Sequence, residues 1–600
     1  MKRAMVTMQE LLDRVTGRKA YALLLISLFC IIVYARTLDV PFYFDDYSYL
    51  VKNPIIRSLG GVFDKGIIAH SKVNYEDVKD NVRIRTLSYF TLAINYYFNG
   101  TSVAGYHAVN IAIHMINAWL IYLLILLTGK LALSRALDES KSRRLNLDVS
   151  WIAFFTAMIF AVHPVMTSSV TYIIQRAALL VTLFYLLTIV LYSRSMQSRR
   201  GSVRFVFYGL ALLSCLAAMR TKEIAFTLPL TLGSYDAIFC PNGNVRQRLI
   251  RLVPFLLTLG IIPFVLNFMY GGFSSKKGEQ FPSTPNAIIY VLKTPAEYLS
   301  TQFKTNPNQT SIVSMSPLEY LFTQFRVIVD YQKMLLVPTG LAFSHDYPFY
   351  RSLADPAVLF SLAFHLMILS AALYCWRLSR IEINERAILL KLSVFGVIWF
   401  YLTLAVESSI VPIDDIFLEY RMYLPAFGYV LALVTMARLA ALRWNGKRLA
   451  SGLLAAIIII FSALAIARNE QWRDPLVFWQ DALAKSPRIK RIHGYIGNVY
   501  RNRGDMPRAL QQYRLMLADD FRYWQDHFEL GKMFYKNGFC RDAVNEYLSA
   551  LKISPDKVFI YEHLSQAYRC LGEDSRAIRA DNMAVQSAVP DKNTGSGSVK

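Results

Sequence analysis

The sequence predicts an all-α membrane protein, in which a polytopic bundle of transmembrane helices is followed by a small helical-repeat domain. Three observations support this fold class. Apolar runs recur between Ala20 and Ala467, many of them long enough to cross a bilayer, and they stop beyond Arg468. Basic residues gather in alternate short connections between these runs. In the last part of the chain, small residues recur every 34 residues.

The composition excludes an ordinary soluble protein of this size, because 54% of the 600 residues are hydrophobic and only 18% are charged. A formal net charge of +23 raises the question of nucleic-acid binding. The basic residues lie in short connections, however, and do not form one continuous patch. We therefore interpret the charge as a mark of membrane topology.

About eleven runs have the length and composition of membrane crossings. The expected spans are 20–36, 108–129, 151–163, 172–192, 205–219, 224–239, 252–270, 357–376, 387–406, 422–437 and 449–467. Arg36 and a stretch of proline and aromatic residues follow the first run without a small-residue cleavage site. We therefore expect a retained anchor and not a cleaved signal peptide.

The basic connections predict the orientation, since short cytoplasmic loops are enriched in lysine and arginine. The N-terminus is expected in the cytoplasm, and the long connections 37–107 and 271–356 are expected outside, as is everything after 468. The segment 317–338 is apolar but carries several charged side chains, so we expect an interfacial or re-entrant helix there. If it crosses, every later connection changes side.

The helical-repeat domain is indicated by four columns with the same period. The columns are Gly504, Gly538 and Gly572; Ala509, Ala543 and Ala577; Gly497 and Gly531; and Tyr500, Phe534 and Tyr568. A period of 34 residues is typical of tetratricopeptide (TPR) helix pairs, which stack through small residues at their crossings. The expected division is a membrane domain over 1–467, a domain of three repeats over 468–590 and a disordered tail over 591–600.

The cysteine spacings and the missing short motifs indicate which cofactors the sequence does not provide for. The six cysteines show no metal-ligand spacing, and Cys540 and Cys570 can pair only if their domain lies in an oxidising compartment. A P-loop, a glycine-rich dinucleotide motif and a zinc motif are absent from the sequence. We assign no metal ligand, and a divalent cation stays open as a cofactor.

The first expected outer connection opens with PFYFDDYSYL, which places Asp45 and Asp46 beside the membrane. Like charges this close raise the pKa of one of the two carboxyl groups, so that one can act as a general base while the other positions a substrate or a cation. A helix N-cap or a solvated acidic turn is the alternative, and the residues alone do not exclude it.

Other ionisable side chains lie at the expected boundaries of spans, where they are functional candidates by default. They are Arg85, His107, His163, Arg176, Lys222, Glu223, His345, Asp346, Glu407, Glu419 and Arg421. Arg176 is placed to hold a lipid-linked phosphate. Some of these groups also have a structural alternative: His163 caps a helix end, Lys222 and Glu223 form an ion pair, and the Glu407–Arg421 charges snorkel at the boundary.

Several segments resemble a known family, in one order and at similar separations over nearly the whole chain. They are PFYFDDYSYLVKNPII, RTLSYFTLAINYYFNG, FAVHPVMTSSVTYIIQRAALL, ESSIVPIDDIFLEYRMYLP and RNEQWRDPLVFWQDALAKSP. The sequence is similar to the transmembrane-and-TPR-containing O-mannosyltransferases and their bacterial relatives. It departs from the family pattern at Thr86, where proline is expected, and in having only three repeats. Both departures favour a bacterial relative.

The resemblance implies a GT-C-type glycosyltransferase that moves a sugar, with inversion, from a polyprenyl-phosphate carrier to Ser/Thr hydroxyls of extracytoplasmic proteins. It implies catalytic roles for Asp45 and Asp46, with Asp45 as the base. Arg176, Lys222 and Arg421 are the candidates that meet the carrier phosphate.

The expected setting is a bacterial inner membrane, with the repeats in the periplasm, where they hold the acceptor protein. Two alternatives remain. One is transfer to a cell-surface glycan or lipid, and the other is a non-catalytic membrane scaffold that uses its TPR repeats. The sugar and the acceptor are not specified by the residues.

Overall fold

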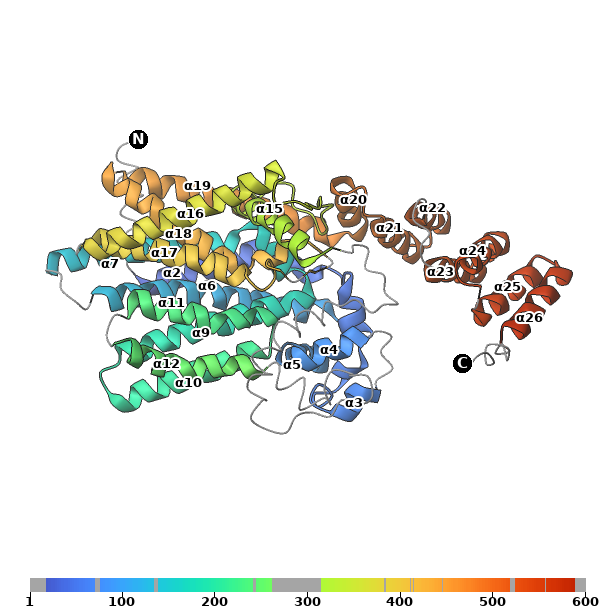
Figure 1. Cartoon of the computed structure of the whole chain (residues 1–600), viewed down its shortest axis with the longest axis horizontal. Coiled ribbons are helices and arrows are strands. Elements are labelled where there is room, and N and C mark those ends of the chain that lie inside the picture. The colour runs from blue at the N-terminus through green and yellow to red at the C-terminus, as the bar shows by residue number, and fades with distance from the viewer. Residues whose placement is uncertain are drawn as a thin grey trace, which may run out of the picture. The chain divides into compact units, whose positions relative to one another are not determined.

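The computed structural model describes residues 18–70, 76–133, 139–240, 244–261, 315–382, 385–410, 412–413, 415–444, 446–517, 524–555 and 557–588. The chain forms two compact units, Met1–Phe478 and Trp479–Lys600. We describe each unit by itself. All regular elements in the described ranges are helices, as the sequence predicts (Figure 1).

The first unit is a bundle of long helices. They are α2 (Lys19–Tyr34), α6 (Val103–Leu133), α7 (Glu139–Val162), α9 (Arg176–Gln197), α10 (Gly201–Met219), α11 (Leu228–Phe239), α12 (Val245–Leu257), α15 (Pro317–Leu336), α16 (Pro356–Ile381), α17 (Glu385–Leu404), α18 (Pro425–Arg443) and α19 (Lys447–Arg473). Three shorter helices, α3 (Lys65–His70), α4 (Glu76–Ile84) and α5 (Thr86–Asn99), lie together at one end of the bundle (Figure 1). We call this the loop end.

In the described part of the chain, nine helices are long and apolar enough to cross a membrane. Each overlaps one of the eleven expected spans. They are Lys19–Asp39, Val103–Leu131, Leu145–Val162, Ile173–Gln197, Gly201–Met219, Pro356–Ile381, Arg386–Leu404, Pro425–Arg443 and Lys447–Arg473. The protein is therefore a multi-pass membrane protein.

The two other expected spans, 224–239 and 252–270, are not among these nine helices, for separate reasons. The span expected at 224–239 is a 3-10 segment, Glu223–Thr227, followed by the 12-residue helix α11. The span expected at 252–270 begins within α12, which contains Pro254, and its part beyond 261 lies outside the described residues. The same holds for 271–314 of the second long connection. Helix α15 is not among the nine candidate spans; it buries Tyr320 and Tyr331 and exposes Leu318 and Leu336.

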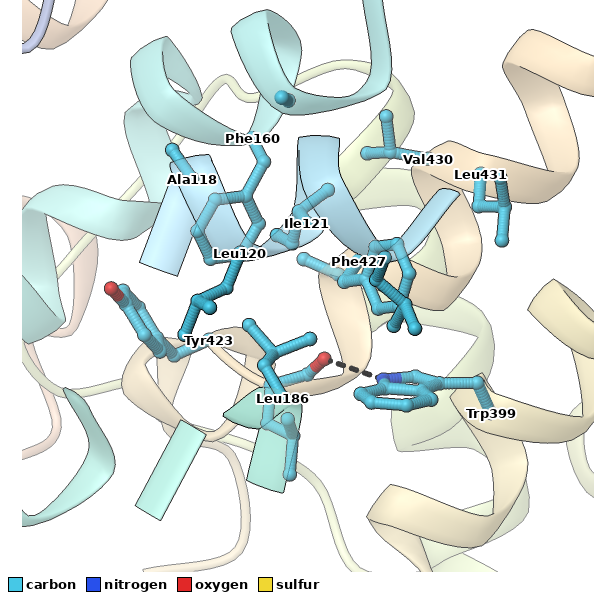
Figure 2. Packing of buried hydrophobic residues seen from close by; sticks show 14 of the residues in the cluster. Ala118, Leu120, Ile121, Phe160, Leu186, Trp399, Tyr423, Phe427, Val430 and Leu431 are labelled. Carbon is cyan, nitrogen blue, oxygen red and sulfur yellow. Dashed lines mark hydrogen bonds between the residues drawn. The ribbon is translucent and has the colours of Figure 1, made fainter. Parts of the chain in front are cut away.

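The core of the bundle is built from side chains of many helices, and Figure 2 shows part of it. Ala118 and Ile121 of α6, Phe160 of α7, Leu186 of α9 and Phe427 of α18 are fully or almost fully buried against one another (Figure 2). In the same figure, the indole of Trp399 donates a hydrogen bond of 3.0 Å to the carbonyl of Leu424. This bond satisfies the single donor of a buried tryptophan.

Helices α17 and α18 approach each other through glycine. A Cβ atom at Gly428 would lie 2.5 Å from the carbonyl oxygen of Gly396, and a Cβ atom at Gly396 would lie 2.5 Å from that of Gly428. Small residues at a helix crossing allow this close approach, which drives helix association in a membrane where lipid competes with apolar side chains.

The second unit consists of helix pairs. After α20 (Pro475–Lys485), which begins in the first unit, the pairs are α21 (Arg491–Asn502) with α22 (Met506–Leu517), α23 (Trp524–Lys536) with α24 (Cys540–Ile553), and α25 (Val558–Cys570) with α26 (Asp574–Ala588). Each turn within a pair ends on glycine with φ between 73° and 79°, namely Gly504, Gly538 or Gly572. The 34-residue spacing of these glycines therefore has a backbone cause.

Equivalent contacts recur between the two helices of each pair. A Cβ atom at Gly497 of α21 would lie 2.5 Å from the ring of Tyr513 of α22, and one at Gly531 of α23 would lie 2.5 Å from the ring of Tyr547 of α24. Cys540 at the start of α24 and Cys570 at the end of α25 form a disulfide, with Cα atoms 6.0 Å apart. Their pairing is the one that the sequence allows in an oxidising compartment.

The boundary between the units differs from the expected position at 467. Helix α19 continues to Arg473, and the rings of Trp472 and Phe478 pack 4.4 Å apart within the first unit. The apolar run ends at 467, but the packing of the first unit extends to Phe478. The expected tail 591–600 lies outside the described residues.

Candidate functional site

The segment Phe44 to Asp46 forms a tight turn between the first span and a short π-helical segment, Tyr47–Val51. Phe44 has a φ of 42°, and in the described ranges it is the one non-glycine residue with a positive φ. A bulky residue rarely adopts this conformation, which persists where surrounding contacts determine the backbone. Tertiary contacts therefore hold this turn.

Both carboxylate oxygens of Asp46 accept hydrogen bonds from the backbone. Oδ2 accepts from the amide of Tyr43 at 3.0 Å, and Oδ1 accepts from the amide of Ile174 at 2.9 Å. The residue is 1% exposed. Burial raises the pKa of Asp46 to about 8, although the two amides favour its charged form. Asp46 thus joins the turn to the segment before α9, and its carboxyl group has little access to a substrate.

Asp45 lies in a different environment. It is half-buried, and its amide donates a hydrogen bond of 3.1 Å to the hydroxyl of Tyr172. Burial raises the pKa of Tyr172, and the charges of Asp45 and Asp46 raise it further. The charge of Asp45 also adds to the raised pKa values of Tyr89 and Tyr420, for which burial is the main cause. The charge of Asp45 therefore acts on tyrosines from three separate segments.

The two adjacent carboxyl groups consequently differ in what they can do. Asp46 is occupied in holding the backbone, whereas Asp45 is the more accessible of the pair. Carboxyl groups in unlike environments are suited to unlike roles. The alternatives of an N-cap and a solvated acidic turn do not describe Asp46, because its side chain makes no cap bond and is buried.

Lys222 and Glu223 are adjacent in sequence but pair with different partners. The Lys222 ammonium lies 2.7 Å from Glu407, and it also lies 5.4 Å from the centre of the Tyr420 ring. Glu223 receives two parallel hydrogen bonds of 3.0 Å from the guanidinium of Arg85. Burial opposes the charged form of Glu223, but Arg85 outweighs it and lowers the pKa of the carboxyl group.

Tyr420 interacts both with the Lys222–Glu407 ion pair and with the charge of Asp45. Its ring faces Lys222, and the charges of Asp415, Glu407 and Asp45 all act on its hydroxyl. The carbonyl of Tyr420 accepts a hydrogen bond of 3.3 Å from Ser169. The charges of the Asp45 turn and of Glu407 therefore both act on Tyr420, although they come from distant parts of the sequence.

Arg176 is fully buried, and its guanidinium is bonded to protein acceptors. Nε donates to Asn110 at 2.8 Å, one terminal nitrogen donates to Asn95 at 2.5 Å and to the carbonyl of Thr91 at 3.2 Å, and the other donates to the carbonyl of Tyr106 at 3.0 Å. This geometry ties α9 to α5 and α6. It favours a positioning role over the phosphate contact that we expected for this residue.

Arg421 is likewise buried and donates to the carbonyls of Ile416 at 3.1 Å and Asp415 at 2.7 Å. Its neighbour Glu419 accepts from the amide of Ala342 at 2.5 Å and lies 3.2 Å from Nε2 of His345. These contacts join the two connections that hold His345 and Arg421. Asp346, beside His345, is half-buried.

The two histidines near the first spans have structural partners. Nε2 of His163 contacts the carbonyl of Leu335 at 2.9 Å, while its Nδ1 accepts from the amide of Val165 at 3.2 Å. The capping alternative thus describes His163. Burial lowers the pKa of His163 to about 4. His107 is fully buried, with Nε2 2.8 Å from the carbonyl of Val40.

Sequence reasoning missed the residues that support the turn from the end of α19. The hydroxyl of Tyr43 donates to the carbonyl of Trp472 at 2.6 Å. Asn469 donates to the carbonyl of Val33 at 2.9 Å and accepts from the hydroxyl of Thr171 at 2.8 Å. The polar residues of RNEQWRDP, directly after the last apolar run, were the available signal.

In the described ranges, no cluster of three or more His, Cys, Asp or Glu side chains is arranged to hold a metal ion. The site is thus composed of carboxylates, paired cations and tyrosine rings. Such a set can accept a proton at Asp45, and it can counter negative charge near Lys222.

Comparison with known proteins finds several similar relatives, three of which are described below, while no family model matches the chain. A protein O-mannosyl-transferase of Caenorhabditis elegans is 24% identical over 540 residues, which is 89% of this chain and 62% of that protein. Human TMTC4 is 24% identical over 82% of this chain and 66% of its own length. Human TMTC1 is 24% identical over 81% of this chain and 53% of its length. Both human proteins are also named protein O-mannosyl-transferases.

The chain therefore spans less than two thirds of the length of these relatives. Among solved structures, ArnT from Cupriavidus metallidurans bound to undecaprenyl phosphate matches 83% of this chain and 76% of its own, with 13% identity and a TM-score of 0.36. That score is too low to support an inference. The sequence matches show a similarity: this chain resembles proteins named protein O-mannosyl-transferases over 81% to 89% of its length.

Proposed function

We propose that this protein is an integral-membrane glycosyltransferase of GT-C type, which transfers a sugar from a polyprenyl-phosphate carrier to Ser/Thr hydroxyls of extracytoplasmic proteins. The observation that carries the proposal is the half-buried Asp45, next to the positive-φ Phe44, in a chain that aligns with a protein O-mannosyl-transferase over 89% of its length. The comparison supports the class of reaction. The arrangement of the side chains at the loop end supports the roles that we assign to individual residues.

Asp45 is the general base of the proposed reaction. Its carboxylate takes the proton of the acceptor hydroxyl while the hydroxyl oxygen attacks the anomeric carbon. The bond between that carbon and the carrier phosphate breaks, so the configuration inverts and the phosphate leaves with its electron pair. Asp46 acts by position, because its bonds to Tyr43 and Ile174 fix the backbone that carries Asp45.

Lys222 is the cation best placed to meet the leaving phosphate. Its ammonium has one ion-pair partner, Glu407, and it lies beside Tyr420, whose hydroxyl also feels the charge of Asp45. Arg421 and Arg176 have their guanidinium groups bonded to protein acceptors. We assign Arg421 and Arg176 to positioning and Lys222 to stabilising the negative charge of the departing phosphate.

The setting of the reaction is the extracytoplasmic side of a bacterial inner membrane. Nucleotide sugars are absent outside the cytoplasm, which favours a donor carried by the bilayer. The Cys540–Cys570 disulfide supports an oxidising compartment for the second unit. We assign the helix pairs of that unit to holding the acceptor protein, since stacked helix pairs form extended binding surfaces.

The test is Asp45→Asn in the full chain, reconstituted in lipid. With undecaprenyl-phosphate mannose as donor and a Ser/Thr-rich peptide as acceptor, we expect transfer to fall by about 10²–10⁴-fold, because the amide cannot take the proton. Mass spectrometry of the peptide measures the transfer. Thermal unfolding of the variant should match that of the native chain.

Asp39→Asn is the matched control. Asp39 lies in the same connection, its side chain is 77% exposed and its contact with Arg473 is 4.0 Å long, so transfer should stay unchanged. Full activity of Asp45→Asn would remove the assigned base. Transfer that fails with the peptide but proceeds to a glycan or lipid acceptor would move the reaction to the alternative acceptor class.

A further inference from the structure

The second unit contains a groove formed by α24, α25 and α26, which follow one another in Figure 1. Its volume is about 670 Å³, within the range of ligand-binding clefts in proteins. On each helix, lining residues recur at helical spacing and so lie on one face. They include Leu548 and Lys552 of α24, Tyr561 and Tyr568 of α25, and Arg579 and Met583 of α26.

The walls of this groove are held in place by the protein itself. Leu551 of α24, Leu564 of α25 and Ala580 of α26 line it and are buried in the core of the unit, so they form an apolar floor. The disulfide between Cys540 and Cys570 joins α24 to α25. A ligand that enters the groove therefore does not have to order its walls, which favours binding.

The charged side chains of the groove are all positive. Lys552, Arg576 and Arg579 line it, all three are exposed, and none of the lining residues is acidic. Arg576 pairs with Glu573 at 2.8 Å, but the two side chains are 57% and 33% exposed, so water weakens this ion pair. Between described residues, Lys552 and Arg579 have no ion-pair partner. The groove therefore offers cations that can pair with the carboxylates of a ligand.

Comparison between the repeats indicates that helix stacking does not require these cations. Positions 34 residues apart are equivalent in this unit, and the position of Arg579 holds Asn545 and Gln511 in the two preceding pairs. The position of Lys552 holds Ala518 in the preceding pair. Lys552 and Arg579 consequently add positive charge that the packing of helix pairs does not need.

Apolar surface lies beside the cations. Leu548 and Met583 are 38% and 52% exposed, and the ring centre of Tyr568 lies 5.9 Å from the guanidinium carbon of Arg576. A small anion would leave these apolar surfaces in water, whereas a peptide with both acidic and apolar side chains would cover them. The lining therefore fits a polypeptide segment.

We propose that this groove binds an acidic segment of the acceptor protein, one that carries apolar side chains between its carboxylates. The carboxylates pair with Lys552, Arg576 and Arg579, and the apolar side chains lie against Leu548 and Met583. That the partner is the acceptor rests on the proposed function, but the binding of such a segment does not. The acceptor is then recognised through residues other than the Ser or Thr that receives the sugar.

The test uses fluorescence anisotropy to measure the binding of a fluorescein-labelled peptide in which glutamate and leucine alternate. The full chain is reconstituted in nanodiscs of phosphatidylcholine, which has no net charge and so neither attracts nor repels the peptide. We expect saturable binding, and a Kd at least about tenfold higher for the same peptide with glutamine at every glutamate. Lys552→Glu combined with Arg579→Glu should raise the Kd of the glutamate peptide by a similar factor, because both substitutions replace attraction with repulsion.

Arg508→Glu combined with Lys536→Glu is the matched control. It changes the charge equally, at exposed positions of α22 and α23 that do not line the groove, so the Kd should stay unchanged. Arg579→Asn is a second variant that the fold accepts, since asparagine occupies the equivalent position of the preceding pair; it should raise the Kd less than the double reversal. Leu548→Ala combined with Met583→Ala should weaken binding several-fold while the charges remain.

An equal Kd for the two peptides, or for the native chain and the Lys552→Glu, Arg579→Glu variant, would overturn the proposal. Binding that appears only after 589–600 are removed would also overturn it, because the chain's own end would then be the occupant.

Two further outcomes separate this inference from the proposed function. Asp45→Asn should bind the peptide with an unchanged Kd. A peptide that binds but receives no sugar on an added Ser would contradict the proposed function and leave the groove assignment intact. Absence of binding in a chain that transfers sugar to the Ser/Thr-rich peptide would contradict the groove assignment alone.

Discussion

The two units of this protein are stabilised by different kinds of contact. In the first unit, the contacts that shape the candidate site join residues far apart in sequence: Asp46 with Ile174, Lys222 with Glu407, and Tyr43 with Trp472. In the second unit, the recurring contacts join neighbours, such as Gly497 with Tyr513 and Gly531 with Tyr547. One unit is held by long-range polar bonds and the other by a repeated local packing rule.

The difference follows from the surroundings of each unit. Helices in lipid gain little from contact between apolar side chains, so close glycine packing and buried polar bonds set their arrangement. Stacked helix pairs in water gain mainly from apolar burial against the next pair. Loss of one contact should therefore spread through the first unit, whereas in the second unit it should remain near the altered pair.

The largest expected effect is that of Arg176→Met. The substitution leaves Asn110, Asn95 and two buried carbonyls without their donor, so we expect a loss of about 3 kcal/mol or more in the free energy of unfolding. Thermal unfolding in detergent micelles measures it. Arg36→Met is the control, because Arg36 is 70% exposed and its removal should cost under about 1 kcal/mol.

A folded, equally stable Arg176→Met variant with a raised KM for the polyprenyl donor would contradict this expectation. It would return Arg176 to the phosphate-binding role that the sequence suggested.

Removal of the disulfide should affect the second unit alone. Cys540→Ser releases a bond between residues 30 apart, and we expect a loss of about 2–4 kcal/mol, confined to α24, α25 and α26. Hydrogen exchange measures protection helix by helix, and that of α18 should not change. Cys375→Ser removes a free thiol and serves as the control. A loss of protection that reached the bundle would show that the two units are not independently stabilised.

Glycine packing in the bundle can be tested with Gly428→Ala. The added Cβ would lie 2.5 Å from the carbonyl of Gly396, a backbone atom that can move only with its helix, so we expect a loss of about 1–3 kcal/mol. Gly452→Ala on α19 meets no atom within 4 Å and should leave stability unchanged or slightly higher. Equal melting temperatures for the two variants would mean that α17 and α18 are not held by close contact.

The smallest expected effect is the loss of stability at mildly acidic pH that His163 causes. Burial lowers the pKa of His163 to about 4, below its ordinary value near 6.5, so the unfolded chain takes up a proton that the folded chain excludes. The stabilising contribution is complete above pH 6.5 and falls as the pH drops toward 4; the loss at pH 5.5 should be about 1 kcal/mol.

His163→Gln keeps a donor and an acceptor at this position but does not titrate. Its melting temperature should therefore depend less on pH between 6.5 and 4 than that of the native chain. If the melting temperatures of the two proteins changed with pH in parallel, protonation of His163 would not destabilise the folded state.

Much of the fold is predictable from local patterns. A run such as Pro356–Ile381 is apolar over its whole length, and this property alone marks it as a span. Helix α11 shows the limit, because its apolar run is divided by a 3-10 segment at Glu223–Thr227 that hydropathy does not reveal. The first compact unit extends beyond the apolar run that ends at 467 for a similar reason, since Trp472 and Phe478 belong to it by packing and not by hydropathy.

The partners of the candidate site residues were not predictable from the sequence. Lys222 and Glu223 were expected as a possible pair, yet each binds a residue more than 100 positions away. Asp45 and Asp46 look equivalent in sequence, but in the structure Asp46 is buried and bonded to the amides of Tyr43 and Ile174, whereas Asp45 is half-buried.

By itself, the sequence determined the helical class, the alternation of apolar runs with basic connections and the 34-residue period, because each of these properties is written in neighbouring residues. The tertiary structure alone decided that Arg176 is buried among amides and carbonyls, that Asp46 holds a backbone turn and that Lys222 faces Glu407. The physical reason is that the partner of a buried polar group depends on how distant helices pack. Local periodicity specifies which face of a helix is buried but not which residue it will meet.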